Sequence, residues 1–233
     1  MPETLPVTAS SPPSARDRAV TLVALAATLA LIHWVPNRPA VTGLLLATWG
    51  LLFYPFSTAE LVAFVVGALF FVGQDYATLK AGSFEFRFKD ILLMPWYEPP
   101  LWGFYFLAIK RVVVGRGDLK TRLSWKSLAG LLVTSTVFSL FSADAHTLFL
   151  ASLASTGVLF VLFHTATDLA FAATALALGA VIELFGVGTG LWKYPEPDVL
   201  GIPYWFSTMW VSVGLLGARF LIPLSEWMAR RIL

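Results

Sequence analysis

Two stretches of the chain match each other at a fixed spacing of 108 residues, without a gap. The matching positions of the first stretch are Gly82, Phe84, Phe86, Asp90, Leu92, Pro95, Trp96, Tyr97, Trp102 and Arg111. Their counterparts are Gly190, Trp192, Tyr194, Asp198, Leu200, Pro203, Tyr204, Trp205, Trp210 and Arg219. The same spacing pairs Asp75 with Glu183 and Glu60 with Asp168. Internal duplication is a common way of building membrane proteins, so we expect two copies of one structural unit.

The composition requires a membrane environment. Apolar residues make up 58% of the chain, charged residues only 13%, and the mean hydropathy is +0.76. This is too little charge to cover the surface of a soluble domain of 233 residues. The chain has no cysteine, which excludes disulfides, thiolate chemistry and a Cys-ligated metal.

Membrane-spanning helices need about 20 apolar residues each. Eight segments are apolar enough: 19–35, 40–56, 59–75, 96–113, 127–142, 146–163, 168–185 and 203–222. Because each copy holds four of them, both copies enter the membrane in the same direction. We therefore expect an all-α, polytopic helix bundle made of two parallel four-helix repeats.

The domain boundaries follow from charge and composition. Residues 1–18 are predicted to be a disordered tail, 19–113 the first repeat, 114–126 a basic linker and 127–233 the second repeat. The positive-inside rule favours a cytoplasmic location for both termini and the linker, because most Lys and Arg fall on that side. We expect a multi-pass protein of the inner membrane.

Each repeat carries a stretch, at 76–94 and 186–202, that is predicted to be irregular. Glycines and prolines interrupt the helical pattern there, and Pro95 and Pro203 stand where a helix can begin without losing a hydrogen bond. Irregular backbone is tolerated near a membrane only at the interface or around a cavity. These two stretches are therefore expected to cover a central site.

Acidic residues near or within the apolar segments are the candidates for chemistry. They are Asp75, Glu183, Asp90, Asp198 and Glu98. Carboxylates are costly in a membrane and suggest function by default, since a desolvated carboxylic acid can act as a general acid. Three other interpretations are open: these residues cap helices, they accept backbone N–H groups in the irregular turns, or they form ion pairs at the surface with Lys89, Lys193 or Arg87.

Aromatic residues indicate what such a site would hold. Trp102 and Trp210 lie two helical turns after the paired prolines and are expected to face a cavity. Their neighbours Trp96, Tyr97, Tyr204 and Trp205 are expected to form an interfacial belt. Arg111 and Arg219 are expected to anchor the cytoplasmic helix ends. The three histidines show no ligand spacing, and neither a metal nor another cofactor is expected.

The repeated pattern of an acid, a glycine, two aromatic residues and a proline resembles the lycopene cyclase domain. It is carried by Asp75, Gly82, Phe84, Phe86 and Pro95, and again by Glu183, Gly190, Trp192, Tyr194 and Pro203. The second copy, with Glu183, Gly186, Tyr194, Gly201 and Trp210, is also similar to the carotenoid hydratase family. The resemblance implies carotenoid biosynthesis, in a helical membrane protein acting on a long isoprenoid.

Together these observations predict acid-catalysed cyclisation or hydration of an isoprenoid. Asp75 and Glu183 would be proton donor and counter-ion, tuned by Asp90, Asp198 and Glu98. The substrate would lie against Trp102, Trp210, Phe84, Trp192 and Tyr194. The alternative is a non-enzymatic membrane carrier or lipid-binding protein. Expected partners are membrane lipid, an apolar small molecule and other subunits of a homo- or hetero-oligomer, but no nucleic acid.

Overall fold

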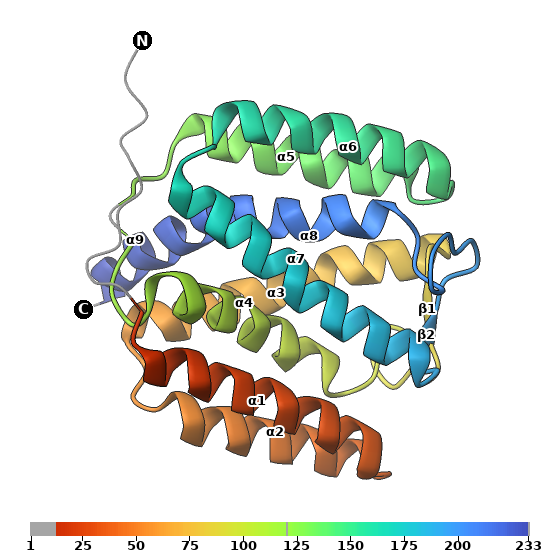
Figure 1. Cartoon of the computed structure of the whole chain (residues 1–233), viewed down its shortest axis with the longest axis horizontal. Coiled ribbons are helices and arrows are strands. Elements are labelled where there is room, and N and C mark those ends of the chain that lie inside the picture. Colours follow the sequence, from red (N-terminus) through yellow and green to blue (C-terminus); the bar gives the residue numbers. More distant parts are fainter. Residues whose placement is uncertain (1–12, 120, 233) are drawn as a thin grey trace.

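The computed structural model describes residues 13–119 and 121–232. It is a helix bundle with one very short two-stranded ladder, which confirms the predicted polytopic helical membrane fold (Figure 1). The first half consists of α1 (Ala15–Trp34), α2 (Arg38–Phe53), α3 (Thr58–Ala81), β1 (Glu85–Phe86) and α4 (Glu98–Val114). The second half consists of α5 (Trp125–Phe141), α6 (Ala145–Leu162), α7 (Ala166–Gly188), β2 (Trp192–Lys193), α8 (Trp205–Leu216), the π-helix η1 (Gly217–Leu221) and α9 (Ile222–Ile232).

Within the described residues, four helical stretches are long and apolar enough to cross a membrane. They are α3, α6, α7 and the continuous run α8–η1–α9, while α2 and α5 are shorter apolar helices. Helices stand at all eight positions that the sequence predicts, but several boundaries differ.

At α1 and α3 the boundaries differ because local capping, and not hydropathy, sets where the helix begins or ends. Ser14 caps α1, so the helix already includes residues 15–18, which were expected in the tail; residues 1–12 lie outside the described part. Helix α3 continues to Ala81, where Gly82 ends it in the left-handed conformation that glycine adopts without strain. Residues 76–81 are therefore helical, and the expectation of an irregular backbone there is wrong.

The two halves repeat the same local structure at the spacing of 108 residues. Helix α3 opens with a capping box between Ser57 and Glu60, and α7 opens with one between Thr165 and Asp168. Figure 1 shows α3 and α7 running in one direction and α4 and α8 in the other, so the two copies are parallel. Both described chain ends and the connection from α4 to α5 lie at one end of the bundle.

A pseudo-two-fold axis relates the halves, and it passes through the short ladder at the opposite end. Strands β1 and β2 pair antiparallel, with Glu85 opposite Lys193, its own counterpart in the second copy. Deeper in the bundle, Trp102 stacks on its counterpart Trp210, with ring centroids 5.4 Å apart. A residue can contact its own copy only where it lies on the axis relating the two. These two pairs therefore mark where the halves meet.

The outer loops also match in backbone conformation. Ile91 bridges to Met94 in the first copy, and Val199 bridges to Ile202 in the second. Leu92 (φ 46°) and Leu200 (φ 54°) both adopt the left-handed region that non-glycine residues rarely enter. Two independent loops would not both adopt this strained backbone at the same step, so the repeat extends through the irregular segments.

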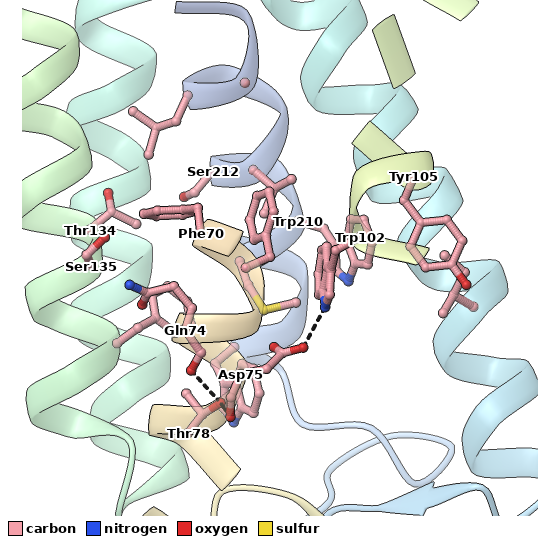
Figure 2. A pocket seen from close by; sticks show the side chains of 18 of the residues that line it. Phe70, Gln74, Asp75, Thr78, Trp102, Tyr105, Thr134, Ser135, Trp210 and Ser212 are labelled. Carbon is pink, nitrogen blue, oxygen red and sulfur yellow. Dashed lines mark hydrogen bonds between the residues drawn. The ribbon is translucent and has the colours of Figure 1, made fainter. Parts of the chain in front are cut away.

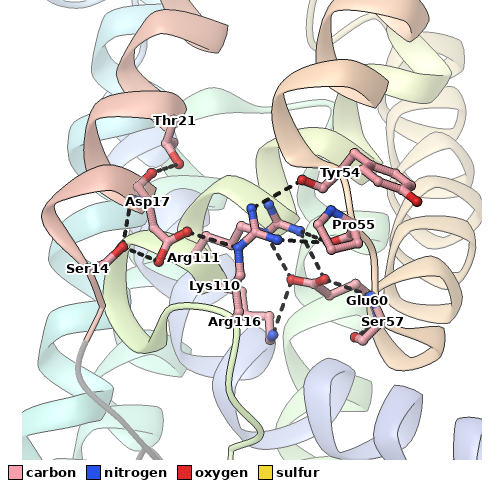
Figure 3. Close-up of polar contacts among 10 residues, drawn as sticks. All are labelled: Ser14, Asp17, Thr21, Tyr54, Pro55, Ser57, Glu60, Lys110, Arg111 and Arg116. Atoms are coloured by element: carbon pink, nitrogen blue, oxygen red, sulfur yellow. Dashed lines mark hydrogen bonds and ion pairs between the residues drawn. The ribbon is translucent and has the colours of Figure 1, made fainter.

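Buried ion pairs fix the other end of the bundle, where α3 meets α4 and α7 meets α8. Arg111 Nε lies 2.9 Å from Glu60 Oε1, and Arg219 Nε lies 2.7 Å from Asp168 Oδ1 (Figure 3 shows the first pair). All four side chains are buried. The expectation that the two arginines are interfacial anchors is therefore wrong: each neutralises a capping carboxylate inside the bundle. In the first copy, Lys110 Nζ also lies 3.4 Å from Glu60 Oε1, whereas Ala218 occupies the matching position of the second copy.

Removing one partner of a buried ion pair leaves an uncompensated charge, which costs about 3–5 kcal/mol. We expect Arg219→Gln to lower the free energy of unfolding by about this amount. Arg111→Gln should lower it less, because Lys110 still faces Glu60. The control is Lys89→Gln, which removes a surface pair worth about 0–1 kcal/mol. Unfolding in mixed detergent–SDS micelles measures all three, and an equal effect for the two arginine variants would contradict this assignment.

A cavity between the repeats

A cavity of about 100 Å³ lies beside the pseudo-two-fold axis. Side chains of α3, α4, α5, α7, α8 and η1 line it, and β1 and β2 close its outer end. The lining is predominantly apolar, and the cavity is only partly enclosed. Among the lining residues, Phe70, Ser135 and Phe220, from α3, α5 and η1, are half-buried.

The cavity exists because the two halves do not pack in the same way. Helix α4 packs on α7, but the counterpart pair, α8 and α3, diverges, and α3 packs on α9 instead. The π-helical turn η1 lies where α8 passes into α9, and Gly217, Phe220 and Leu221 of this turn line the cavity. A π-turn inserts an extra residue into a helix and often marks a functional site. The asymmetry thus leaves this cavity on the α5 side of the axis.

Three of the predicted acidic residues line this cavity: Asp75, Glu98 and Glu183. They lie close enough together for their charges to interact. The Trp102 indole N–H donates to Asp75 Oδ2 over 2.5 Å. Glu183 Oε2 accepts bonds from the Trp192 indole (2.8 Å) and the Tyr194 hydroxyl (2.7 Å). These bonds orient the two carboxylates from α3 and α7 within the bundle.

Glu98 differs from the other two carboxylates. It lies in the first turn of α4 and is 8% exposed, yet no described residue donates a hydrogen bond to it. In the second copy its position is occupied by Phe206. The start of a helix stabilises a carboxylate to some extent through the helix dipole. Glu98 is nevertheless a buried acceptor of the cavity wall without a protein partner among the described residues.

A small polar group on the α5 side was not predicted from the sequence. Figure 2 shows Gln74 pointing toward Thr134 and Ser135, while its neighbour Asp75 points toward Trp102. The Thr134 hydroxyl is buried and has no hydrogen-bond partner among the described residues. A comparison of the two copies could have identified these three polar residues, because each has an apolar counterpart. The counterparts of Gln74, Thr134 and Ser135 are Ile182, Ala26 and Ala27.

Aromatic rings form much of the cavity wall. Trp102 stacks between Phe71, at 4.5 Å, and Trp210, at 5.4 Å between ring centroids. The other predicted binding residues, Phe84, Trp192 and Tyr194, line the cavity near the ladder. The expected aromatic belt is split: Trp96 and Tyr204 are exposed, but Tyr97 and Trp205 are buried. Trp205 is itself part of the cavity wall.

Asp90 and Asp198 do not reach the cavity. Asp90 forms a two-pronged ion pair with Arg38 and accepts the backbone N–H of Trp96, and Asp198 accepts the backbone N–H of Tyr204. The Arg38 guanidinium holds the pKa of Asp90 below its usual value. Both residues hold the outer loops in shape, which was one of the open interpretations of the sequence.

The ladder at the outer end is tied by charge. Glu85 Oε1 lies 2.9 Å from Lys193 Nζ, and Glu85 Oε2 lies 2.9 Å from Lys89 Nζ. Hydrogen bonds from these two ammonium groups lower the pKa of Glu85 to about 2, and Lys193 has the larger effect. The pairs are solvent-exposed and contribute little stability. The pair between Glu85 and Lys193 nevertheless joins the two copies at the outer end of the cavity.

The comparisons with known proteins show similarity in fold only. No family model matches the chain, and no curated protein matches it in sequence. Two solved structures have a similar fold: the mycobacterial Insig homologue MvINS from Mycobacterium vanbaalenii, and a cross-linked trimer of MvINS. Each has a TM-score of 0.62 and 16% identity, covering 74% of this chain and 95% of the other.

These findings correct the family expectation. The resemblance to lycopene cyclase domains and carotenoid hydratases is wrong, because the similar folds are those of an Insig homologue. The predicted acid-catalysed conversion of an isoprenoid, and with it a role in carotenoid biosynthesis, is contradicted as well.

Trp210 packs closely against Gly179 of α7, so we expect a larger side chain at position 179 to lower stability. A Cβ atom at Gly179 would overlap the Trp210 indole ring, so Gly179→Ala should displace that ring and destabilise the protein by about 1–3 kcal/mol. The control is Gly157→Ala on α6, where nothing lies within 4 Å and alanine should be neutral or stabilising. Thermal unfolding in detergent compares the two, and equal melting temperatures would contradict the packing described.

Proposed function

We propose that this chain is a non-enzymatic membrane protein that binds a lipid in the cavity between its two repeats. The observation that carries the proposal is the cavity itself, an apolar, aromatic-lined and partly open space inside a membrane bundle. Ligand sites are typically concave and apolar, with a few polar groups that fix orientation. Gln74, Thr134 and Glu98 supply such polar groups here.

The surroundings support a lipid as the ligand. The side of the cavity that carries the half-buried Phe70, Ser135 and Phe220 is formed by α3, α5 and η1, and α3 is a membrane-capable helix. A lipid from the surrounding bilayer would need no aqueous route to reach this side. Among the predicted binding residues, Trp102, Trp210, Phe84, Trp192 and Tyr194 would contact its apolar part.

The orientation in the membrane and the oligomeric state are part of the same proposal. We infer an inner-membrane protein with cytoplasmic termini, because the bundle end that holds both termini and the α4–α5 connection carries Arg16, Arg18, Arg116 and Arg122. Assembly into oligomers is supported only by the cross-linked trimer among the fold neighbours.

Blocking the cavity from α5 tests the proposal. Ser135 lines the cavity, whereas Ser139, one turn further along the same helix, is exposed on the outer surface. In lipid nanodiscs, 9,10-dibromostearyl alcohol should quench the fluorescence of the cavity tryptophans in a saturable manner. Ser135→Phe should weaken this binding by about tenfold, a loss of about 1.4 kcal/mol, because the ring fills the space.

The matched control is Ser139→Phe, which adds the same ring on the outer surface and should bind as the unchanged protein does. Loss of binding in both variants would point to a general disturbance of α5. Quenching that never saturates in the unchanged protein would show simple partitioning into the bilayer, and the proposed function would fail.

A further inference from the structure

The charge balance of the cavity differs from that of the rest of the bundle. Elsewhere, the buried capping carboxylates Glu60 and Asp168 are each neutralised by an arginine. In the cavity, Asp75, Glu98 and Glu183 lie within electrostatic range of one another. No lysine, arginine or histidine is among the described residues that line the cavity.

Helix dipoles do not supply the missing positive charge for all three groups. Glu98 is at the start of α4, where the dipole favours a negative charge. Asp75 and Glu183 lie in the C-terminal halves of α3 and α7, where the dipole offers no such help. A buried carboxyl group without a counter-charge is uncharged, because it takes up a proton. A ligand that brings a positive charge would stabilise the ionised form of these groups and would itself be held there.

A metal ion does not fit this arrangement. Among the described residues, no group of three or more histidine, aspartate or glutamate side chains is placed to hold a metal. An organic ammonium group needs no such tight shell, because it donates hydrogen bonds to separate carboxylates and is attracted to aromatic rings.

The hydrogen bonds inside the cavity leave acceptors available for such a group. Trp102 occupies one oxygen of Asp75, and Trp192 and Tyr194 share one oxygen of Glu183. The other oxygen of each, and the whole Glu98 carboxylate, have no donor among the described residues. A cavity of about 100 Å³ accommodates an ammonium head and the first carbons of its chain.

We infer that the cavity takes a lipid with a cationic amine head group, held by Glu98 together with Asp75 and Glu183. The inference rests on the proposed function, that the cavity binds a lipid, and adds the chemistry of the head group. The apolar chain would pass along the aromatic wall toward the side lined by Phe70 and Phe220.

Three probes with the same chain and different heads test the inference. Full-length protein in phosphatidylcholine nanodiscs at pH 7 is titrated with 9,10-dibromostearylamine, the matched alcohol and the matched carboxylic acid. We expect the amine to quench tryptophan fluorescence with an affinity at least about tenfold higher than that of the alcohol, and the acid to bind most weakly. An alcohol that binds as tightly as the amine would overturn the head-group inference while leaving lipid binding intact.

Variants assign the preference to the cavity. Glu98→Gln keeps the shape but cannot become negatively charged when an amine binds, so it should fold and should reduce the amine-to-alcohol preference to about threefold or less. Asp75→Asn, which can still accept from Trp102, provides a second variant should the first not fold. The control is Glu196→Gln, an exposed position outside the cavity, which should keep the full preference.

Each remaining outcome decides the matter. An amine preference unchanged in both Glu98→Gln and Asp75→Asn would show that the bilayer surface or another site supplies it, and would overturn the inference. Tighter binding of the acid would do the same. Saturable quenching by none of the three probes would overturn both the inference and the proposed function.

Discussion

The paired arginine–carboxylate contacts are the constraint on which the two-copy arrangement depends. Glu60 pairs with Arg111 near the end of α4, and Asp168 pairs with Arg219 in η1, so each contact joins the start of a long helix to the helical segment that follows it in the chain. A buried guanidinium is tolerated only where its charge is met in a fixed geometry. These contacts therefore set how far each helix pair can slide, and the ladder at Glu85 and Lys193 sets the other end. Between these two ends of the bundle, the helices of the two copies can pack differently.

The difference between the copies produces the cavity. Helix α4 fills its groove against α7, whereas α8 leaves α3 and turns through η1 into α9. The two copies also differ in polarity at matching positions. Phe206 is the counterpart of Glu98, and Ile182 is the counterpart of Gln74. The repeat thus determines the arrangement of the helices, and the differences between the two copies determine the chemistry of the cavity.

Periodicity and spacing predicted the fold well, because they depend on local rules. Apolar run lengths located the helices, and the even number of helices in each copy implied parallel repeats. The role of Arg111 was not predictable, since a sequence does not show that a basic residue at a helix end turns inward to Glu60. The family resemblance failed for a related reason. The spacing of glycine, aromatic residues and proline between Gly82 and Pro95 is set by the geometry of the loop. Loops of the same geometry can occur in proteins with unrelated functions.

Contacts across the pseudo-two-fold axis have an evolutionary consequence. Glu85 meets its own counterpart, as does Trp102, so a half-length ancestor could have assembled as a symmetric homodimer through the same surfaces. Such a dimer must carry two identical sites, because any substitution appears on both sides. Fusion into one chain removes this restriction: Phe206 can replace a carboxylate on one side while Glu98 remains on the other. Gene fusion would then have turned two equivalent half-sites into a single specialised one.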